Sequence, residues 1–488
     1  MQKDIIIIGS GFAALAASCY LAGQGNRVVI YEKNAATGGR AGQLRQEGFT
    51  FDTGPTWYWM PDVFERFFAD FDKKPSGYYS LQKLHPAYQV YFGENDFISI
   101  PGTPEAIIEV FEKEEAGSGK KLRKFLARAE ANYNIAIKDL VYRPGVSPLE
   151  LLTPATLKKL RYFFSSVKKE VRSSFTNNRL IHILEFPVLF LGAKPGNTPA
   201  FYNFMNFADF GLGTWYPENG MYSVVQGIER LALELGVSVK TNHPVEKITV
   251  ENGKATGIIC KGEKIQADIV LSGADYHHSE SLLDEKYRSY SETYWEKKTF
   301  APSSLLFYVG FNKKMKNIAH HTLFFDVDFE THARAIYDEP KWPEKPLFYA
   351  SFPSKTDKNA APEGYEAAVF LIPIAPGIED TPEIRERYFN MIMERFERLT
   401  RQEAKKNLIF KASFCVTDFI KAYHAYKGNA YGMANTLMQT AFLRPKLKSK
   451  KVANLYFTGQ LTVPGPGVPP SLISGKLAAA LIKKHHAL

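Results

Sequence analysis

The sequence of 488 residues has room for roughly two to four domains. Hydrophobic residues make up 45% of it and charged residues 23%, a composition that excludes wholesale disorder and coiled coil. Lysine and arginine outnumber aspartate and glutamate by 61 to 51, which gives a net charge of +10. We therefore expect an anionic partner: a nucleic acid, a membrane surface or a phosphate-bearing cofactor.

The three cysteines, Cys19, Cys260 and Cys415, lie far apart. They form neither a metal-binding spacing nor a disulfide framework, which indicates a reducing compartment. No stretch approaches the ~18 uninterrupted apolar residues of a transmembrane helix. The apolar run Ile5 to Ile8 is too short for a signal peptide. We expect a chain with neither a membrane span nor a secretion signal.

The first forty residues predict a βαβ unit. Ile5 to Ile8 is a β-branched run typical of a buried parallel strand, Leu15 to Ala22 follows as a helix, and Arg27 to Tyr31 forms a second strand. Between the first strand and the helix stands Gly9-Ser10-Gly11-Phe12-Ala13-Ala14, which fits G-x-G-x-x-A. This order of elements predicts a dinucleotide-binding site.

Each position of this motif has a physical role. Gly9 allows the tight turn, Gly11 lets the backbone approach a pyrophosphate, and Ala14 permits close packing of helix on strand. The first N–H groups of the helix point at the phosphates. Glu32 ends the second strand, where a carboxylate accepts hydrogen bonds from ribose hydroxyls.

A second glycine pair, Gly38-Gly39, comes just before Arg40. It suggests backbone close to a long ligand, with the guanidinium placed to bind phosphate oxygens. An ordinary loop with a solvated arginine fits this segment equally well. A turn-rich segment, Phe51 to Thr56, then leads into three aromatic residues, Trp57, Tyr58 and Trp59.

The dinucleotide unit continues much later in the chain. Short apolar runs separated by turn residues predict further strands. Near the C-terminus, the last of these strands is followed by a proline-glycine loop and then by a predicted helix from about Ser471 to Lys484. The predicted strands are Val237 to Lys240, Val245 to Val250, Gly257 to Cys260, Ala267 to Leu271 and Asn454 to Phe457.

Two insertions separate these pieces. We assign residues 1–102, 236–290 and 416–488 to one discontinuous cofactor-binding domain. Residues 103–235 are predicted to be a helical insertion, and residues 291–415 a second domain of strands and helices. Its predicted elements are the strands Leu305 to Phe311 and Ala367 to Ile374 and a helix from about Thr381 to Leu399.

With these motifs assembled, the chain resembles the bacterial phytoene-desaturase family of carotenoid oxidoreductases. The N-terminal motifs are shared by many flavin amine oxidase-like enzymes. The C-terminal block is more specific to the carotenoid branch. The matching segments are Leu455 to Gly459, Pro464 to Pro469, Gln439 to Pro445, Gly192 to Phe201 and Trp215-Tyr216-Pro217. Where relatives have a glycine pair after that last segment, this chain has Asn219-Gly220, and asparagine tolerates the left-handed conformation.

The resemblance implies an α/β fold, with an FAD-binding Rossmann-like domain and an interleaved substrate domain of sheet plus helices. It implies FAD bound non-covalently in an extended form. The ADP part would contact Gly9, Gly11, Phe12, Ala13, Ala14, Glu32 and Lys33, with Val245 at the adenine side. The pyrophosphate would lie at Gly38, Gly39 and Arg40, and the flavin end near Gly54, Pro55, Thr56, Gly459, Gly467, Val468 and Pro469.

The resemblance also implies a reaction: a hydride, which FAD accepts, and a proton are removed from a long polyene to form a carbon–carbon double bond, without a metal. Trp57, Tyr58, Trp59 and Trp215 are the candidates for the substrate tunnel. Glu150 falls nearest to the position where relatives have an acidic residue. However, Ser147-Pro148-Leu149-Glu150 also fits a helix capping box, which is the role we favour. For His320 and His321 we favour a surface turn over a proton-transfer role.

A carotenoid is insoluble in water, so we expect it to arrive from a bilayer. Thr153-Pro154 predicts the start of a helix that runs to about Arg172, apolar on one side and basic on the other. A packed helix with a solvated basic face fits the pattern equally well. We interpret the helix as a contact with an anionic membrane surface, which predicts a cytoplasmic protein attached to the inner face of the membrane. The membrane-facing candidates are Lys158, Lys159, Phe163, Phe164, Lys168 and Lys169.

Several functions remain open at this point. The leading prediction is a phytoene desaturase that passes its electrons to oxygen or a quinone, and a desaturase that makes the 3,4 double bond of hydroxylated carotenes is the alternative within the family. A flavin amine oxidase would also fit the N-terminal motifs, as would a non-catalytic flavoprotein of the membrane surface. Nucleic-acid binding is disfavoured because no recognised binding motif is present.

Overall fold

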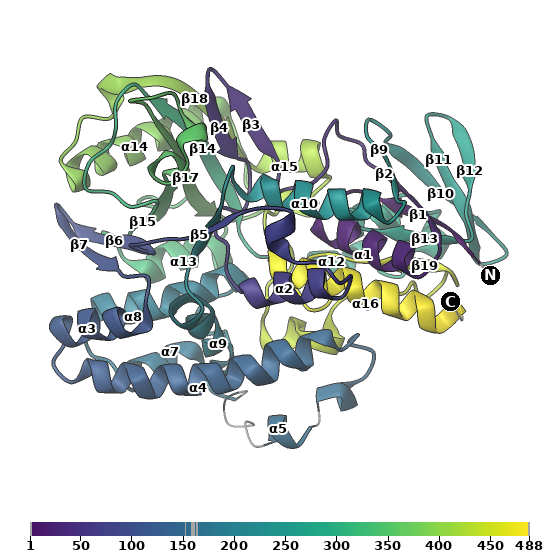
Figure 1. Cartoon of the computed structure of the whole chain (residues 1–488), viewed down its shortest axis with the longest axis horizontal. Helices are drawn as coiled ribbons and strands as arrows, with labels where there is room; N and C mark the ends of the chain where they lie inside the picture. Colours follow the sequence, from purple (N-terminus) through teal and green to yellow (C-terminus); the bar gives the residue numbers. More distant parts are fainter. Residues whose placement is uncertain (1, 152, 158–161, 163, 487–488) are drawn as a thin grey trace.

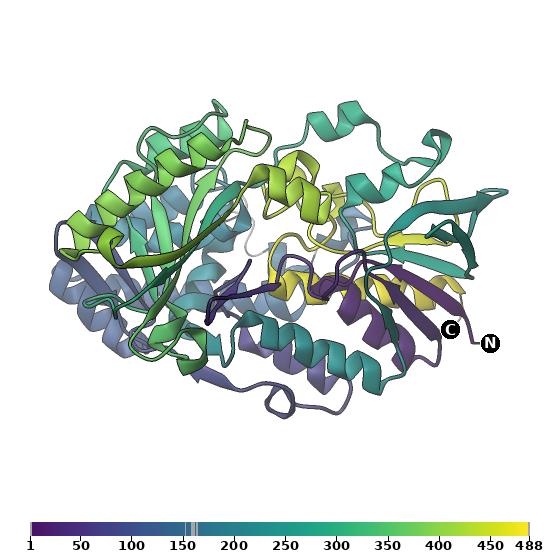
Figure 2. The same ribbon diagram turned by 90° about the horizontal axis from the view of Figure 1, so that it is seen from above.

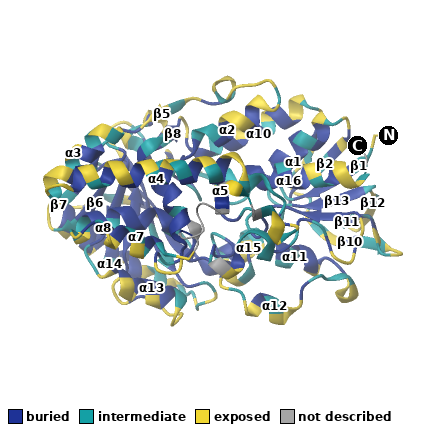
Figure 3. Cartoon of the chain, turned by 90° about the horizontal axis from the view of Figure 1, so that it is seen from below, coloured by how far each residue is buried: buried dark blue, intermediate teal, exposed yellow. Residues whose placement is uncertain are grey.

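The structure is a computed structural model that describes residues 2–151, 153–157, 162 and 164–486. Two sheets lie side by side, with a layer of helices packed beneath them (Figures 1 and 2). The strands of both sheets are largely buried, whereas the outer faces of the covering helices are exposed (Figure 3). The cavity described below lies between the two sheets.

The first sheet is parallel and is assembled from distant parts of the chain. Its strand order is β19-β13-β1-β2-β9, and each neighbouring pair is parallel. Successive isoleucines of the first strand face opposite sides of the sheet and are buried on both, as their β-branched run predicts. The predicted strands are thus confirmed: β1 (Asp4–Ile8), β2 (Arg27–Tyr31), β9 (Ser238–Lys240), β13 (Ile269–Ser272) and β19 (Leu455–Phe457).

Helices cover one face of this sheet and a small antiparallel sheet covers the other. On the helical face, small residues let two helices approach closely: a Cβ added at Gly475 would lie 2.5 Å from the carbonyl oxygen of Ala13. These helices are α1 (Phe12–Gly23), α10 (Met221–Glu234) and α16 (Val468–His486). The antiparallel sheet is β10 (Val245–Glu251), β11 (Lys254–Cys260) and β12 (Glu263–Gln266).

The second sheet has seven strands in the order β18-β14-β17-β16-β15-β6-β7. Its strand β14 is buried along its whole length, and α14 (Pro382–Thr400) packs against the sheet. The strands are β6 (Tyr88–Gly93), β7 (Asp96–Ile100), β14 (Ser303–Phe311), β15 (His321–Phe324), β16 (Phe348–Ser351), β17 (Glu366–Ile374) and β18 (Leu408–Phe414). Residues 88–100 therefore pair within this sheet, whereas our sequence-based division placed them in the first domain.

The remaining elements join or cover these sheets. The helical layer consists mainly of α3 (Pro104–Glu114), α4 (Ser118–Lys138), α8 (Asn178–Glu185) and α9 (Phe204–Asn206). Two short antiparallel pairs are β3 (Gln43–Gln46) with β4 (Phe49–Asp52) and β5 (Leu81–Lys83) with β8 (Trp215–Pro217). The other helices are α2 (Pro61–Ala69), α11 (Tyr276–Ser281), α12 (Glu292–Glu296), α13 (Phe329–Tyr337) and α15 (Val416–Tyr423).

The prediction of one continuous helix from Pro154 to Arg172 is wrong. The structure has α5 (Pro154–Leu157) and α7 (Val167–Arg172), with a bend before the second helix. Ser166 caps α7: its hydroxyl accepts a hydrogen bond from the backbone N–H of Lys169 at 3.2 Å. Lys158, Lys159 and Phe163 lie outside the described residues. No helix in the described part combines the length and apolar composition needed to cross a bilayer.

Candidate active site

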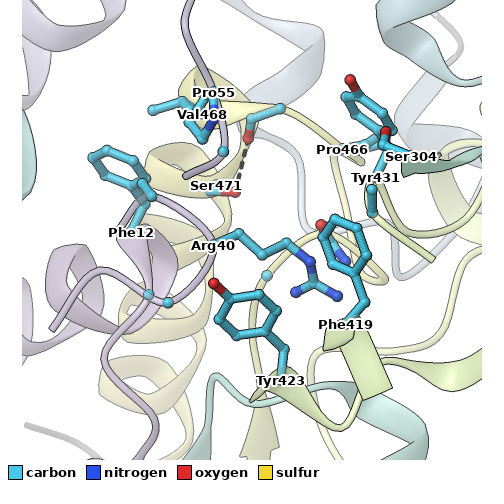
Figure 4. A pocket seen from close by; sticks show the side chains of 18 of the residues that line it. Phe12, Arg40, Pro55, Ser304, Phe419, Tyr423, Tyr431, Pro466, Val468 and Ser471 are labelled. Carbon is cyan, nitrogen blue, oxygen red and sulfur yellow. Dashed lines mark hydrogen bonds between the residues drawn. The ribbon is translucent and has the colours of Figure 1, made fainter. Parts of the chain in front are cut away.

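One cavity of about 480 Å³ lies between the two sheets (Figure 4). Loops of the first domain line one half, and the second sheet and its helices line the other half. The glycine-rich loop lies in the first half, whereas the second half is mainly apolar and aromatic. The two halves meet near the C-terminal loop that precedes α16.

The glycine-rich loop forms the floor of the first half. Gly9 has a φ of +85°, a conformation that favours glycine, and Gly11 is the N-cap residue of α1. A Cβ added at Gly11 would have no atom within 4 Å, so open space lies over the helix N-terminus. Gly38 forms a β-bridge with Gly11 and brings the second glycine pair to the same place. An extended diphosphate fits this space.

Glu32 lies at the carboxyl end of β2 and is 4% exposed. Its Oε2 accepts hydrogen bonds from the backbone N–H of Ser10 at 2.9 Å and from the Ser10 hydroxyl at 2.7 Å. Its Oε1 accepts one from the backbone N–H of Asn34 at 2.8 Å. These contacts fix the carboxylate at the cavity wall, where its remaining lone pairs suit ribose hydroxyls.

Arg40 reaches into the cavity, and its guanidinium lies over the ring of Tyr423, 5.4 Å from the ring centroid (Figure 4). Its Nη2 donates to the carbonyl of Asn429 at 3.3 Å, while its buried Nε has no hydrogen-bond partner in the described part of the chain. Burial lowers the pKa of Arg40, and the carboxylate of Asp275 acts in the opposite direction. A buried cation with an unused donor suits a phosphate oxygen, which favours the cofactor role over the solvated loop.

Most of the other predicted cofactor residues also line this cavity. They are Phe12, Ala13, Lys33, Gly39, Gly54, Pro55, Thr56, Val245, Gly459, Gly467, Val468 and Pro469. Ser471 supports the C-terminal loop, since its hydroxyl donates to the carbonyl of Gly467 at 2.7 Å (Figure 4). Ala14 is the exception. It is fully buried, and a Cβ added at Gly273 would lie 2.7 Å from its methyl group, so it serves helix packing and not cofactor contact.

The second half of the cavity contains no Asp, Glu, Lys or Arg among the described residues that line it. Trp57 and Trp59, two of the tunnel candidates, line it. The indole of Trp57 stacks on His321 at 4.0 Å, and the Trp59 Nε1 donates to the Thr214 hydroxyl at 2.8 Å. The further lining residues include Phe186, Leu189, Leu323, Phe325, Phe329, Ile336, Leu347, Tyr349 and Leu371.

Two predicted tunnel residues do not reach the cavity. Tyr58 points to the other side of its segment, because side chains alternate along extended backbone. There it stacks on Phe64 at 4.3 Å and its hydroxyl bonds that of Tyr79 at 2.9 Å. Trp215 lies in β8, where its Nε1 donates to the carbonyl of Leu212 at 3.0 Å. Neither residue is among those that line the cavity.

Glu150 also lies away from the cavity, so the structure gives it no catalytic position. Its carboxylate accepts hydrogen bonds from the backbone N–H groups of Gly145 at 2.8 Å and Val146 at 3.0 Å. It reaches back to the N–H of Ser147 at 3.4 Å, while the Ser147 hydroxyl accepts from Leu149 at 3.2 Å. This is the capping role that the sequence favoured, on a short 3₁₀ turn.

His320 and His321 are buried rather than at the surface, because they lie at the start of strand β15 in the second sheet. Burial lowers the pKa of His320 to about 3 and that of His321 well below its usual value, so both are neutral near pH 7. His321 Nδ1 is 2.7 Å from the Tyr349 hydroxyl, which is also 2.8 Å from that of Thr56. This set of contacts holds Tyr349 and Trp57 at the cavity wall.

Sequence reasoning missed the cavity residues supplied by the second sheet and by α13. Ser304 and Leu306 of β14, Tyr349 of β16 and His332 of α13 all line the cavity. His332 is structural: its Nε2 is 2.8 Å from the carbonyl oxygen of Pro373 and its Nδ1 accepts from the N–H of Leu347 at 3.0 Å. The alternation within the predicted strand Leu305 to Phe311 was the one signal available, and it does not tell which face meets the cofactor domain.

Comparison with known proteins decides the family. Residues 12–483 match the model of the flavin-containing amine oxidoreductase family. The chain belongs to that family. FAD is accordingly its cofactor, and the glycine-rich loop, Glu32 and Arg40 are the groups that fit it.

Curated relatives are carotenoid desaturases. A carotenoid 3,4-desaturase from Haloarcula japonica is 40% identical over 99% of this chain and 98% of the relative. A zeta-carotene-forming phytoene desaturase from Myxococcus xanthus is 31% identical over 97% and 93%. The chain is therefore an FAD-dependent oxidoreductase of the carotenoid desaturase type, as predicted.

Solved structures show the same fold at low identity. An oxidoreductase from Methanosarcina mazei superposes with a TM-score of 0.65 at 18% identity, covering 97% of this chain and 98% of that one. A putrescine oxidase superposes with a TM-score of 0.62 at 13% identity, covering 99% of each chain. The predicted fold class is thereby confirmed.

Proposed function

We propose that this protein introduces a carbon–carbon double bond into a C40 carotenoid. Bound FAD would supply the hydride acceptor. The glycine-rich loop, Glu32 and Arg40 bind the cofactor's polar half, and the aromatic half of the cavity orients the polyene and excludes water. Phytoene and a hydroxylated carotene that gains a 3,4 double bond are the two candidate substrates.

The observation that carries this proposal is the uncharged second half of the cavity. An amine substrate is cationic near neutral pH and needs an anion or a polar cage when it leaves water. The described lining there offers no carboxylate, and its histidine has both ring nitrogens engaged within the protein. A hydrocarbon chain fits such a wall with little loss of hydrogen bonds. The similarity to carotenoid desaturases supports the same substrate class.

The test is product analysis with the purified, FAD-loaded protein. Phytoene and a 1-hydroxycarotene are supplied in liposomes with an electron acceptor, either oxygen or a quinone. We expect a product with a longer polyene from at least one of them. A second arm supplies putrescine as an amine control. Oxidation of the amine without desaturation of either carotenoid would contradict the proposal.

We further propose that the protein attaches to the cytoplasmic face of a membrane. Four large apolar side chains near α5 and the loops beside it are strongly exposed: Val146 at 62%, Leu149 at 69%, Phe164 at 81% and Met438 at 72%. Gly145 and Ala441 are close neighbours, so the loops that carry Val146 and Met438 share one region. Apolar side chains held out in this way suit the boundary between lipid headgroups and acyl chains.

The two described lysines of the predicted membrane-facing set differ in how available they are to lipid headgroups. Lys168 forms a salt bridge with Glu330, whereas Lys169 is exposed. The test is sedimentation with anionic liposomes of a variant in which Leu149 and Phe164 are replaced by serine. We expect weaker binding than for the wild type. A variant with serine at the exposed Ile409 and Ile420, on other elements, is the control. Equal binding of all three proteins would refute the attachment site.

A further inference from the structure

Desaturation needs a group that takes up a proton. Formation of the double bond breaks two C–H bonds: a hydride leaves with its electron pair for the flavin, and a proton leaves while the electrons of its bond form the π bond. The substrate is thereby oxidised by two electrons and the flavin reduced by two. The described lining of the apolar half offers no carboxylate or amine, and both nitrogens of His332 are engaged within the protein. The phenol of Tyr349 is the candidate, because it connects this wall to groups outside the cavity.

The hydroxyl of Tyr349 lies at the cavity wall, next to the segment expected at the flavin end. It is 2.8 Å from the hydroxyl of Thr56, which belongs to that segment, and 2.7 Å from Nδ1 of His321. Burial raises the pKa of this phenol, and hydrogen bonds from side chains that include Thr56 and Trp57 act in the opposite direction, as donors to the oxygen do. The proton of the phenol itself is therefore donated to His321 Nδ1.

Two histidines continue from this phenol into the protein. His321 is 0% exposed and His320 is 4% exposed, and their ring centroids lie 4.5 Å apart. The Nδ1 of His321 accepts from Tyr349, and that of His320 is 2.8 Å from the Thr356 hydroxyl. The Nε2 of each ring has no hydrogen-bond partner in the described part of the chain. Because a neutral imidazole has one donor and one acceptor nitrogen, His321 carries its proton on Nε2, and His320 accepts at Nε2 when it donates from Nδ1.

The far end of these contacts lies beside a second cavity. Thr356 is half-buried, and the next residue, Asp357, lines a polar cavity of about 220 Å³ together with Tyr216 and Asp52. The Tyr216 ring packs 4.6 Å from that of His320, and its hydroxyl donates to the Asp357 carboxylate at 3.2 Å. Burial raises the pKa of Asp52 to about 7, so its carboxylate binds a proton near neutral pH. This cavity suits the end of a proton path that begins in an uncharged one.

We propose that Tyr349 takes up the substrate proton and that the two histidines carry it to Thr356. This inference rests on the proposed function. The substrate proton binds the Tyr349 oxygen as the proton of the phenol passes to Nδ1 of His321. The Nε2 proton of His321 then passes to Nε2 of His320. The Nδ1 proton of His320 passes to the Thr356 hydroxyl, whose own proton leaves for the second cavity. One O–H or N–H bond forms for each that breaks, so every side chain ends neutral and one proton is released.

The first test uses Tyr349→Phe, which keeps the ring and removes the hydroxyl. Phytoene or a 1-hydroxycarotene in liposomes, whichever the wild type desaturates, is mixed with the FAD-loaded protein, and the longer polyene is followed by absorbance in a single turnover. We expect this rate to fall about 100-fold, as loss of a general base does. Flavin content, and carotenoid affinity from tryptophan quenching, should stay unchanged. Equal rates in the two proteins, or a carotenoid affinity that falls as far as the rate, would overturn the inference.

A second variant separates proton transfer from positioning. In His321→Asn the amide oxygen takes the place of Nδ1, so it still accepts the hydrogen bond from Tyr349, but no second nitrogen passes a proton on. We expect the rate to fall about tenfold or more. Tyr91→Phe is the matched control, because Tyr91 is a buried phenol of the same sheet whose hydroxyl donates to the carbonyl of Asn317 at 2.6 Å, outside the cavity lining. A wild-type rate in His321→Asn would show that the ring only positions the phenol, and would overturn the path.

The inference and the proposed function fail in different ways. If the wild type desaturates neither carotenoid, the proposed function is wrong. If it desaturates one, and Tyr349→Phe does so at the same rate, the function stands and the proton path is wrong. The wild type alone also tests the path, whether or not a variant folds. The O–H and N–H protons of the path exchange with solvent, so the single turnover should be slower in D₂O than in H₂O, and equal rates in the two solvents would contradict the path.

Discussion

At the scale of single residues, Gly11 shows how an absent side chain makes a binding site. Space is open around the position where its Cβ would stand, directly over the N-terminus of α1. Gly11→Ala should therefore leave the fold intact, with a loss of unfolding free energy within about 1 kcal/mol. The added methyl group occupies the place of the pyrophosphate, so we expect FAD affinity to fall about tenfold or more.

Flavin absorbance per protein after dialysis measures this loss. Gly77→Ala is the control, because an added Cβ there also meets no atom within 4 Å and Gly77 lies outside the cavity. Equal flavin content in the two variants would show that the cofactor does not approach Gly11.

Asp209 predicts a pH dependence of stability. It is 2% exposed and accepts hydrogen bonds from the Tyr88 hydroxyl at 2.8 Å and the Thr214 hydroxyl at 3.4 Å. Burial raises its pKa to about 7, and these hydrogen bonds act in the opposite direction. The native state thus holds a proton that the unfolded chain releases near pH 4, so stability from this group falls as pH rises from about 4 to 7.

Asp209→Asn removes this titration and preserves the shape of the side chain. Relative to the variant, the wild type should lose about 2 kcal/mol of unfolding free energy between pH 5 and pH 7. Urea unfolding of both proteins at the two pH values measures the difference. The Thr214 hydroxyl also accepts a hydrogen bond from the Trp59 indole, so Asp209 supports this cavity-lining tryptophan through Thr214. Parallel pH profiles would mean that Asp209 is ionised throughout.

At the scale of elements, the contact between α1 and α16 joins the two ends of the chain. Gly475 sits against the backbone of Ala13, and the C-terminal loop before α16 forms part of the cavity. Gly475→Ala forces these helices apart, so we expect a loss of about 2 kcal/mol in unfolding free energy together with weaker FAD binding. Gly23→Ala, in α1 with room for the methyl group, should be neutral or stabilising in thermal unfolding. Equal thermal stability of the two variants would contradict the close approach of the helices.

Elements with local signals were predictable from the sequence. The glycine motif, Glu32 and the β-branched strands depend on neighbours a few residues away, and the structure has them where the patterns indicate. Asn219 likewise adopts the left-handed conformation expected of it, with a φ of +65°. The prediction of one helix from Pro154 to Arg172 was wrong because Ser166 caps the start of a new helix, whereas the apolar spacing on which the prediction depended favours one continuous helix.

The substrate half of the cavity was less predictable because distant contacts decide it. Trp57, Tyr58 and Trp59 are equally aromatic, yet extended backbone sends Tyr58 to the opposite side. His321 was expected at the surface, and pairing of β15 within the second sheet buries it against Trp57. Ser304 carries no motif at all. It becomes part of the cavity wall only because the second sheet packs against the cofactor-binding domain.

At the scale of the whole molecule, both sheets contribute to the wall of one cavity, whose described lining is polar at the cofactor end and uncharged at the other. This division suits the proposed desaturase reaction, because an uncharged wall accepts a hydrocarbon chain at a lower cost than a cationic amine. It predicts that oxidation of the substrate and reduction of the bound flavin occur together inside a single dry cavity.

The most direct measurement is a single turnover without oxygen. The FAD-loaded protein is mixed with liposomes that contain the hydroxylated carotene, and absorbance is recorded with time. We predict that the flavin bands bleach as the carotenoid bands shift to longer wavelength, one flavin for each new double bond. Flavin that stays oxidised while the carotenoid spectrum is unchanged, with phytoene as well as with the hydroxylated compound, would contradict the account.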